Sequence, residues 1–316
     1  MQKKRVAIIG ANGFVGLSVS KALAKKGYLV HALIRDNFSG NKKIYNNLSI
    51  KTLIVGDLEN IKKINLKGNQ FDYVINLAAR AHVKKKISAD AKKTINKLSN
   101  IEKNIVKNFN IKNIKLIQLS SAKVKLIESK SKLDDSEFIY VKAKLKSEEI
   151  IRNNLSNYII LRPPLIYGPN VKANFLALIK AIDYRLPLPF LKVENLRSYL
   201  YIENLVDLIL TVIEKNHFSN DYYYICDGNP ISTKKICDVI AKYLFKKPRY
   251  FNLNKNILYF LAKTVNKQNL LNKVIGDFVI SNKKINKDLG WRPKYNLNSG
   301  IKNTCFWYKT MFKMKV

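Results

Sequence analysis

The beginning of the chain, an apolar run followed by three spaced glycines, limits the possible folds most strongly. Val6–Ile9 is apolar without alternation, which predicts a strand buried on both faces of a parallel sheet. Gly10 permits a tight turn, Gly13 permits the close approach of a ligand, and Gly16 permits close packing of the following helix. That helix is expected over residues 14–26, where apolar residues recur at helical spacing. The free N–H groups at the N-terminus of this helix favour the binding of a pyrophosphate. The alternative interpretation is a strand–helix turn that binds no ligand.

Strand and helix patterns then alternate through the first half of the chain. Five further apolar segments predict strands, at residues 28–34, 48–55, 71–77, 114–119 and 158–162. Helical patterns separate them, among them a lysine-rich region that ends near Phe109 and a helix from Tyr140 to about Asn153. Repeated strand–helix units predict an α/β fold with a Rossmann-type, doubly wound parallel sheet, whose ligands bind at the carboxyl ends of the strands.

The pattern changes after Pro163-Pro164, where prolines become frequent and helices dominate. We therefore expect a dinucleotide-binding domain at residues 1–166 and a smaller, mainly helical substrate-binding lobe at residues 167–316. Strands and helices within residues 198–226 are expected to complete the first domain, and the remainder is expected to be helical.

The charge of the chain raises the question of a nucleic-acid partner. The 316 residues carry a net charge of +36, a balance that occurs in proteins that bind nucleic acids. The lysines are spread over the whole chain, however, and basic segments interleaved with aromatic residues do not stand out. We therefore interpret the surplus as solvent-exposed charge and expect no nucleic-acid partner.

Other sequence features bear on location and metal content. The apolar run after the basic first residues stops at Gly10, too early for a signal peptide, and no segment approaches the ~18 apolar residues that cross a bilayer. The three cysteines lack CxxC spacing, and the three histidines lack metal-ligand spacing. We expect a cytoplasmic protein with reduced thiols, without a membrane span and without a structural metal.

The end of the second predicted strand bears on cofactor choice. An acidic residue there binds the ribose 2′-hydroxyl of NAD, whereas an arginine accommodates the 2′-phosphate of NADP. Arg35 is followed by Asp36, so these residues leave NAD and NADP open as cofactors. Two exposed loop charges without a cofactor role are the alternative.

Three side chains form the best-supported chemical group. Tyr140 and Lys144 are four residues apart, on one face of a predicted helix. A free tyrosine has a pKa near ~10, and a nearby lysine cation favours its phenolate form. Ser121 follows the strand predicted at residues 114–119 and is placed to hydrogen-bond the same substrate oxygen. Together these groups can move a proton at an alcohol carbon while a nicotinamide exchanges hydride with that carbon.

These motifs resemble those of one known family, the extended short-chain dehydrogenase/reductases, in their sugar-nucleotide epimerase/dehydratase branch. The resemblance covers nearly the whole chain and is nearest to a bacterial subgroup described as UDP-glucose 4-epimerase-like. The matching segments are Gly10-Ala-Asn-Gly-Phe-Val-Gly16, Gly56-Asp-Leu58, Asn76-Leu-Ala-Ala79, Leu119-Ser-Ser121, Tyr140-x-x-x-Lys144, Arg162-Pro-Pro-Leu-Ile-Tyr-Gly-Pro169, Arg197-Ser-Tyr-Leu-Tyr201 and Leu289-Gly-Trp-Arg-Pro293.

The resemblance implies roles for the matching residues. It makes Ser121, Tyr140 and Lys144 the catalytic residues, and Asn96 a supporting active-site asparagine. Together with Arg35, the residues expected along the cofactor are Gly10, Asn12, Gly13, Phe14, Val15, Gly16, Asp57, Leu58, Leu77, Ala78, Ala79, Tyr140, Lys144 and Pro163. The residues expected against the substrate are Ser121, Asn174 and Arg197, whose guanidinium suits a diphosphate. A surface charge is the alternative for Arg197.

Two segments depart from the family pattern. Val124-Lys125-Leu126 stands where a Val-Tyr-Gly or Val-Asn-Gly sequence is frequent after the serine, in a loop that borders the sugar. Ile34 aligns with the aspartate of NAD-binding epimerases, and Arg35 follows it. The first departure leaves the identity of the sugar undetermined, and the second allows NADPH as the cofactor.

The leading hypothesis is a 4-epimerase that acts on a UDP-hexose or a UDP-N-acetylhexosamine through a 4-keto intermediate. A 4-keto-sugar-nucleotide reductase of surface-polysaccharide synthesis, which consumes NADPH, is the second hypothesis. A non-catalytic dinucleotide-binding module is the third. The resemblance also implies a homodimer formed through two helices of the larger domain.

Overall fold

The computed structural model describes residues 3–35, 41–57, 66, 70–78, 90–109, 114–129, 131, 133–253, 271 and 274–312. The chain divides into two compact units. Unit 1 comprises Met1–Pro163, Val206–Tyr224 and Lys287–Trp291, and unit 2 comprises Pro164–Leu205, Ile225–Asn286 and Arg292–Val316. The domain boundary predicted after residue 166 stays a prediction. Residues 287–291 also belong to unit 1, and the sequence analysis did not predict this.

Unit 1 is built on a parallel sheet. Among the described residues this sheet has seven strands, in the order β10-β6-β5-β4-β1-β2-β3, and all neighbours are parallel. The strands are β1 (Arg5–Ile9), β2 (Leu29–Ile34), β3 (Lys51–Ile54), β4 (Tyr73–Asn76), β5 (Lys115–Leu119), β6 (Tyr158–Arg162) and β10 (Asp221–Tyr224). The order reverses next to β1, as in doubly wound nucleotide-binding sheets. The Rossmann-type prediction is therefore confirmed.

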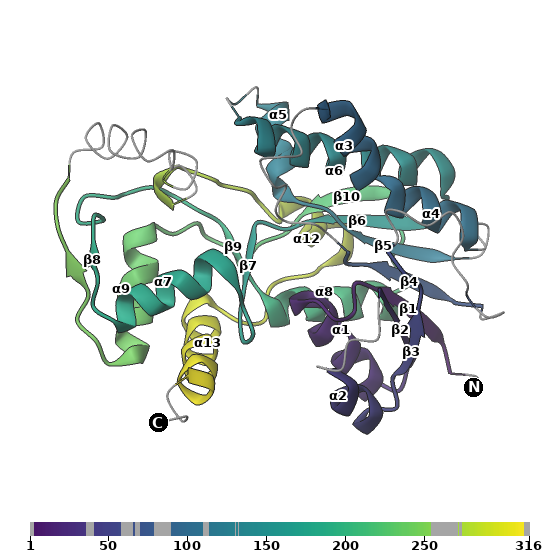
Figure 1. Cartoon of the computed structure of the whole chain (residues 1–316), viewed down its shortest axis with the longest axis horizontal. Coiled ribbons are helices and arrows are strands. Elements are labelled where there is room, and N and C mark those ends of the chain that lie inside the picture. Colours follow the sequence, from purple (N-terminus) through teal and green to yellow (C-terminus); the bar gives the residue numbers. More distant parts are fainter. Residues whose placement is uncertain are drawn as a thin grey trace. The chain divides into compact units, whose positions relative to one another are not determined.

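Helices cover both faces of this sheet. They are α1 (Phe14–Lys25), α2 (Lys42–Asn47), α3 (Ala91–Leu98), α4 (Asn100–Asn108), α5 (Lys125–Glu128), α6 (Asp135–Asn154) and α8 (Ile202–Glu214), with a 3-10 turn, η3, at Ala122–Val124. Figure 1 shows α3, α4 and α6 on one side of the sheet and α1 and α8 on the other. Both faces of the central strands are therefore buried, as the unbroken apolar runs predicted.

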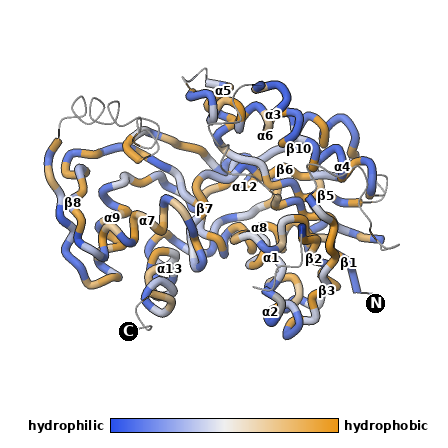
Figure 2. The backbone as a smooth tube through the Cα atoms, viewed as in Figure 1, coloured by the Kyte–Doolittle hydropathy of each residue, from blue (hydrophilic) through white to orange (hydrophobic). Residues whose placement is uncertain are grey.

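The core of unit 1 consists of these strands. Val6, Ala7 and Ile8 in β1 are fully buried, and every residue of β6 is buried. Figure 2 shows hydrophobic stretches of the backbone around β1, β2 and β3. Burial of such side chains supplies most of the favourable free energy of folding.

Unit 2 is mainly helical, as predicted. Its helices include α7 (Ala173–Asp183), α9 (Thr233–Leu244) and α13 (Leu297–Phe312), and α12 (Lys283–Leu289) continues into unit 1. Within the described part, two small parallel sheets pair β7 (Leu165–Tyr167) with β9 (Tyr199–Tyr201) and β8 (Pro187–Leu188) with β11 (Arg249–Tyr250). The prediction that the remainder after residue 226 is helical is therefore wrong at β11, a strand of two residues with no periodic signal.

Two predicted elements in unit 1 have different bounds. The helix expected from Tyr140 begins at Asp135, because the Asp134 carboxylate accepts a hydrogen bond from the Glu137 amide (2.8 Å) and caps the first turn. The strand expected at residues 48–55 is limited to Lys51–Ile54, because the chain leaves α2 through Ser49, whose φ of 53° is left-handed. Local polar caps and turns, rather than the apolar pattern, set both boundaries.

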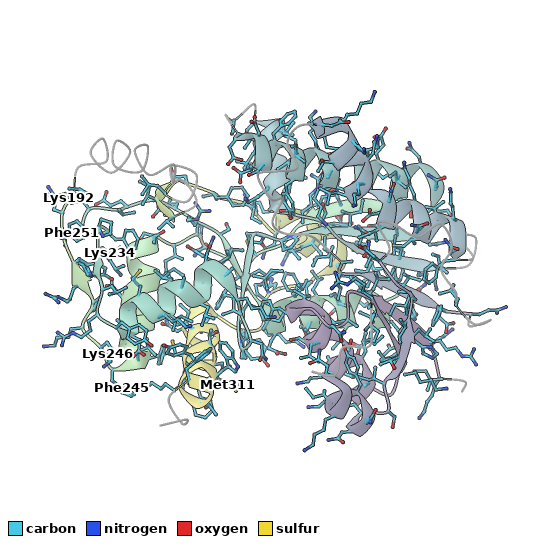
Figure 3. The ribbon with its side chains drawn as sticks, viewed as in Figure 1. Lys192, Lys234, Phe245, Lys246, Phe251 and Met311 are labelled. Atoms are coloured by element: carbon cyan, nitrogen blue, oxygen red, sulfur yellow. The ribbon has the colours of Figure 1, made fainter. Side chains whose placement is uncertain are left out.

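The surface of unit 2 carries large hydrophobic side chains among lysines. Figure 3 shows Lys192, Lys234, Phe245, Lys246, Phe251 and Met311 among the side chains of unit 2. Phe245 is 87% exposed, and the Lys309 ammonium lies 4.2 Å from the centre of its ring. Such a cation partly covers an aromatic face that would otherwise meet water.

All three cysteine thiols of the chain are unpaired with one another. Cys226, Cys237 and Cys305 are free and buried, and burial raises the pKa of the last two to about 12. Across the described ranges, no helix combines the length and the apolar character that crossing a bilayer requires. In the same ranges no group of three or more metal-binding side chains comes together.

A buried ion pair joins α6 to the end of β6. The guanidinium of Arg162 donates two hydrogen bonds to the carboxylate of Glu148 (3.0 and 2.7 Å), and both side chains are almost completely buried. The ring of Tyr222, in the neighbouring β10, lies 3.7 Å from the guanidinium carbon, and Glu128 accepts a further bond at 3.0 Å. Removal of either charge of such a pair leaves the other buried without compensation.

We expect Glu148→Ala to lower the free energy of unfolding by about 3–5 kcal/mol, because the Arg162 charge loses its bidentate partner. Urea denaturation followed by fluorescence measures this loss. Glu214→Ala, which breaks an exposed pair with Lys26 (3.0 Å), is the matched control and should cost no more than about 1 kcal/mol. Equal effects of the two substitutions would contradict the assigned importance of the buried pair.

A second buried carboxyl group, Asp227, organises unit 2. It accepts hydrogen bonds from the Tyr201 amide (2.8 Å), the Asn204 side chain (2.8 Å) and the Tyr167 hydroxyl (3.0 Å). Burial raises the pKa of Asp227 from 3.8 to about 6 in spite of these donors. The folded chain therefore binds this proton more tightly than the unfolded chain does.

The stabilisation from this proton is complete below about pH 4 and is lost as the pH rises through about 6. At about 1.4 kcal/mol per pKa unit, the loss amounts to at most about 3 kcal/mol. We expect the unfolding free energy of the wild type to fall between pH 4 and pH 7 relative to that of Asp227→Asn. Asp72→Asn, which removes a solvent-accessible carboxyl, serves as the control, and parallel pH curves for all three proteins would refute the assignment.

Candidate active site

Gly10 and Gly16 in the first turn have the tight conformation and the close packing that were predicted for them, whereas the approach of a ligand to Gly13 stays a prediction. Gly10 has a left-handed φ of 79°, and a Cβ atom there would lie 2.8 Å from the Ala78 nitrogen. A Cβ atom on Gly16 would lie 2.2 Å from the Gly10 carbonyl oxygen, closer than any side chain can pack. The Gly13 amide donates to the same oxygen at 3.0 Å. The turn thus places the N-terminus of α1 at the carboxyl end of β1, where free N–H groups suit a phosphate.

The side chain of Asn12 is held beside this turn. Its amide oxygen accepts hydrogen bonds from the Tyr45 hydroxyl (3.0 Å) and the Asn41 amide (3.3 Å). Burial raises the pKa of Tyr45 to about 12, so Tyr45 remains a neutral donor at physiological pH. The helix α1 then begins with Phe14 and Val15, both half-buried. The loop from β2 to α2 is therefore tied to the glycine turn through Asn12.

Further predicted cofactor residues follow neighbouring strands. Arg35 is exposed directly after β2, Asp57 is half-buried after β3, and Leu77 and Ala78 follow β4. These strands are parallel, so their carboxyl ends, and these residues, lie along one edge of the sheet. Asp36, Leu58 and Ala79 fall outside the described residues. The choice between NAD and NADP therefore stays open at the end of β2.

The tyrosine and the lysine lie one turn apart on α6. Tyr140 is half-buried, whereas Lys144 is buried, with 7% of its surface exposed. The ammonium of Lys144 donates to the Leu119 carbonyl at 3.3 Å, at the last residue of β5. Lys144 is thus held by the carbonyl group of Leu119, the residue that lies two positions before Ser121 in the sequence.

Ser121 and Pro163 complete the same edge. Ser121 is nearly buried after β5, and its hydroxyl oxygen accepts from the Lys123 amide at 3.3 Å. The carbonyl of Pro163, which follows β6, accepts from the Ala122 amide at 2.8 Å. The segments after β5 and β6 are therefore joined, and every predicted catalytic residue belongs to unit 1.

The segment Val124-Lys125-Leu126, which departs from the family pattern after the serine, is helical. Val124 ends η3, and Lys125 begins α5. The Lys123 ammonium and the Glu137 carboxylate form an ion pair between η3 and α6, which the sequence did not lead us to expect. This pair holds the segment after Ser121 against the helix that carries Tyr140.

The predicted substrate residues belong to unit 2. Asn174 is exposed in the first turn of α7. Arg197 is half-buried; its guanidinium donates to the Gly276 carbonyl, and its backbone exchanges hydrogen bonds with Ile231 (3.0 and 2.9 Å). In unit 1, the amide oxygen of Asn96, on α3, accepts from the Lys146 ammonium. The substrate-binding roles of Asn174 and Arg197 and the supporting role of Asn96 in the active site stay predictions.

The parallel sheet, the glycine turn and the tyrosine and lysine on α6 define an α/β protein of the dinucleotide-binding, Rossmann type. Residues 6–226 match the model of the NAD dependent epimerase/dehydratase family. The chain belongs to this family, which confirms the resemblance found in its motifs.

Several known proteins are similar to this chain over almost its whole length. The chain is 27% identical over 318 residues to a UDP-glucose 4-epimerase from Vibrio cholerae, covering 95% of this chain and 94% of the relative. A UDP-glucose 4-epimerase from Thermotoga maritima, solved with UDP-glucose, is similar with a TM-score of 0.71 at 22% identity, covering 97% and 99%. A dTDP-glucose 4,6-dehydratase from Bacillus anthracis, solved with NAD, has a TM-score of 0.70 at 16% identity, covering 98% of each. These structural likenesses extend the shared fold to the full chain.

Gly16→Ala tests whether the turn is the dinucleotide site. The new methyl group would meet the Gly10 carbonyl and displace the N-terminus of α1, so we expect the Kd for NAD⁺ or NADP⁺ to rise at least about tenfold. Isothermal titration calorimetry measures the change.

Gly27→Ala is the control for a general loss of stability, because Gly27 also has a positive φ but open space around it. Wild-type affinity in folded Gly16→Ala protein, verified by circular dichroism, would exclude the turn as the binding site.

Proposed function

We propose that this protein is an NAD(P)-dependent sugar-nucleotide 4-epimerase that acts on a UDP-hexose or a UDP-N-acetylhexosamine. One observation carries the proposal. Lys144 is buried one helical turn from Tyr140 and donates to the strand end that leads to Ser121, on the sheet edge that also carries the glycine turn. Family membership and the full-length similarity to a UDP-glucose 4-epimerase support it.

The proposed roles follow from the chemistry of these side chains. A dinucleotide held at the turn of Gly10, Gly13 and Gly16 would supply the reversible hydride exchange at C4 of the sugar. Tyr140 takes the proton of the C4 hydroxyl in the first half of the reaction and gives it back in the second. Ser121 donates a hydrogen bond to the same oxygen, and the buried Lys144 lies one helical turn from Tyr140. Because the hydride and the proton both return, the overall reaction changes no oxidation state.

The substrate residues that we propose are Asn174 and Arg197. The guanidinium of Arg197 suits the diphosphate of a UDP-sugar, since its planar donors match phosphate oxygens. The proposal also includes the cytoplasmic location expected from the sequence, and the role in polysaccharide synthesis and the homodimer that the family resemblance implies.

A second candidate is a 4-keto-sugar-nucleotide reductase. Arg35, exposed directly after β2, favours it, because an arginine at this place accommodates the 2′-phosphate of NADP. Such an enzyme would use Tyr140 once per turnover as a proton donor and would consume NADPH.

Product analysis of purified protein separates the candidates. We expect turnover of UDP-galactose or UDP-N-acetylglucosamine without added reductant, and a fall in kcat of at least about 10²-fold in Tyr140→Phe, which lacks the proton-transferring hydroxyl. Tyr184→Phe, at a tyrosine that is 70% exposed in unit 2, is the matched control and should keep full activity.

Stoichiometric loss of NADPH with a 4-keto sugar, and no epimerisation, would replace the leading proposal by the reductase. Activity that is unchanged in Tyr140→Phe would point to the third possibility, a dinucleotide-binding module without catalysis through this residue.

A further inference from the structure

A buried carboxyl group near the centre of unit 1 has no place in the chemistry described above. Glu102, on α4, exposes only 2% of its surface. Its Oε1 accepts hydrogen bonds from the side-chain amides of Asn76 (3.1 Å) and Gln118 (2.9 Å), and its Oε2 accepts from the Ser147 hydroxyl (2.9 Å). The Asn76 amide also donates to the Gln118 carbonyl oxygen at 2.9 Å. Four side chains from four elements thus form one closed polar cluster.

The stability of the fold does not account for this cluster. The three donors to Glu102 are neutral, and burial raises the pKa of the carboxyl group even though the Lys144 charge lowers it. Burial of a carboxyl group is costly, and apolar side chains of similar size at such positions are often equally or more stabilising. A buried carboxyl group that is hydrogen-bonded to side chains from three other elements indicates a requirement for their exact placement.

The first arm of the cluster reaches the glycine turn. The Asn76 side chain donates to Glu102 with its nitrogen, and its oxygen accepts from the Ala78 amide at 3.2 Å. Ala78 is the residue whose backbone lies against Gly10, where a Cβ atom would come within 2.8 Å. Glu102 therefore fixes, through Asn76, the segment that faces the proposed dinucleotide site.

The other two arms reach the proposed catalytic residues. Gln118 immediately precedes Leu119, whose carbonyl accepts from Lys144. Ser147 lies on α6, three residues after Lys144 and on the same side of the helix. Both structures that hold Lys144, the end of β5 and the body of α6, are therefore bonded to the same carboxyl group.

We infer that Glu102 is a positioning residue, which holds the segment after β4, the end of β5 and α6 in one arrangement around the dinucleotide and the Tyr140–Lys144 pair. This inference rests on the proposed function. Glu102 acts through Asn76, Gln118 and Ser147, and it takes no part in proton transfer to the substrate.

Two substitutions distinguish the effect of the hydrogen bonds of Glu102 from the effect of the space that its side chain fills. In Glu102→Gln the Oε1 atom still accepts from Asn76 and Gln118, and the new NH₂ group can donate to the Ser147 hydroxyl, which accepts as well as donates. In Glu102→Leu all three bonds are lost at similar side-chain volume. The conservative variant should therefore rescue what the apolar variant loses.

We expect Glu102→Leu to raise the Kd for NAD⁺ or NADP⁺ at least about tenfold and to lower kcat at least about tenfold, whereas Glu102→Gln stays within about threefold of the wild type in both. Calorimetric titration gives Kd, and the epimerase assay gives kcat. Ile105→Val is the matched control: it shortens a fully buried side chain one turn along the same helix, so it should lower the melting temperature and leave Kd unchanged.

A double-mutant cycle tests the route through Asn76. Asn76→Ala should weaken binding by itself, and the double variant Asn76→Ala/Glu102→Leu should bind no worse than the weaker single variant, since both substitutions break one arm. Where Glu102→Leu fails to fold, the effect of Asn76→Ala on Kd decides alone.

The outcomes distinguish this inference from the proposed function. A wild-type protein that binds neither dinucleotide overturns both. A wild type that binds, together with folded Glu102→Leu protein of unchanged Kd and kcat, overturns the inference alone. Loss of binding in Ile105→Val equal to that in Glu102→Leu also overturns it, because general destabilisation would then explain the effect.

Discussion

The contact between the Gly10 carbonyl oxygen and the backbone of Gly16 determines how unit 1 begins. A methyl group at Gly16 would approach this oxygen to 2.2 Å, so the turn exists only with hydrogen at that position. The contact sets the start of α1 against the end of β1, and Gly10 in turn lies against the segment after β4. Two neighbouring strands and one helix are thus placed by positions without side chains, and the remaining strands add to them in parallel.

Several polar groups buried in unit 1, among them Asn76, Ser120 and Arg162, lie at or directly after the carboxyl ends of strands. The carboxylate of Glu148 is neutralised by Arg162 at the end of β6 and accepts from the Ser120 hydroxyl at 2.5 Å. Glu102 instead has neutral donors and bonds the ends of β4 and β5 to α6. The first arrangement compensates a buried charge, and the second fixes relative positions. Buried carboxyl groups of one unit therefore contribute in two physically different ways.

Much of the fold was predictable because its signals are local. The apolar runs at residues 6–9 and 158–162 and the glycine spacing depend on neighbours in sequence, and the structure has these elements where they were expected. Glu102 carried no such signal: it lies in a region rich in lysine and asparagine, and its partners Asn76 and Ser147 are 26 and 45 residues away. The pairing of Arg162 with Glu148 and the short strands of unit 2 likewise depend on tertiary contacts. The fold alone does not identify the reaction, because an epimerase and a dehydratase share this fold at nearly equal TM-scores of 0.71 and 0.70.

Unit 1 is made of three separate segments of the chain, and this affects how it can fold while the chain is being synthesised. The strand β10, at Asp221–Tyr224, pairs with β6, and Lys287–Trp291 belongs to the same unit. While the ribosome is still adding residues 164–220, the backbone of β6 presents unpaired N–H and C=O groups along one side, an open edge of the kind that recruits strands from other chains. A gene truncated after residue 163 would therefore encode a sheet that lacks its closing strand.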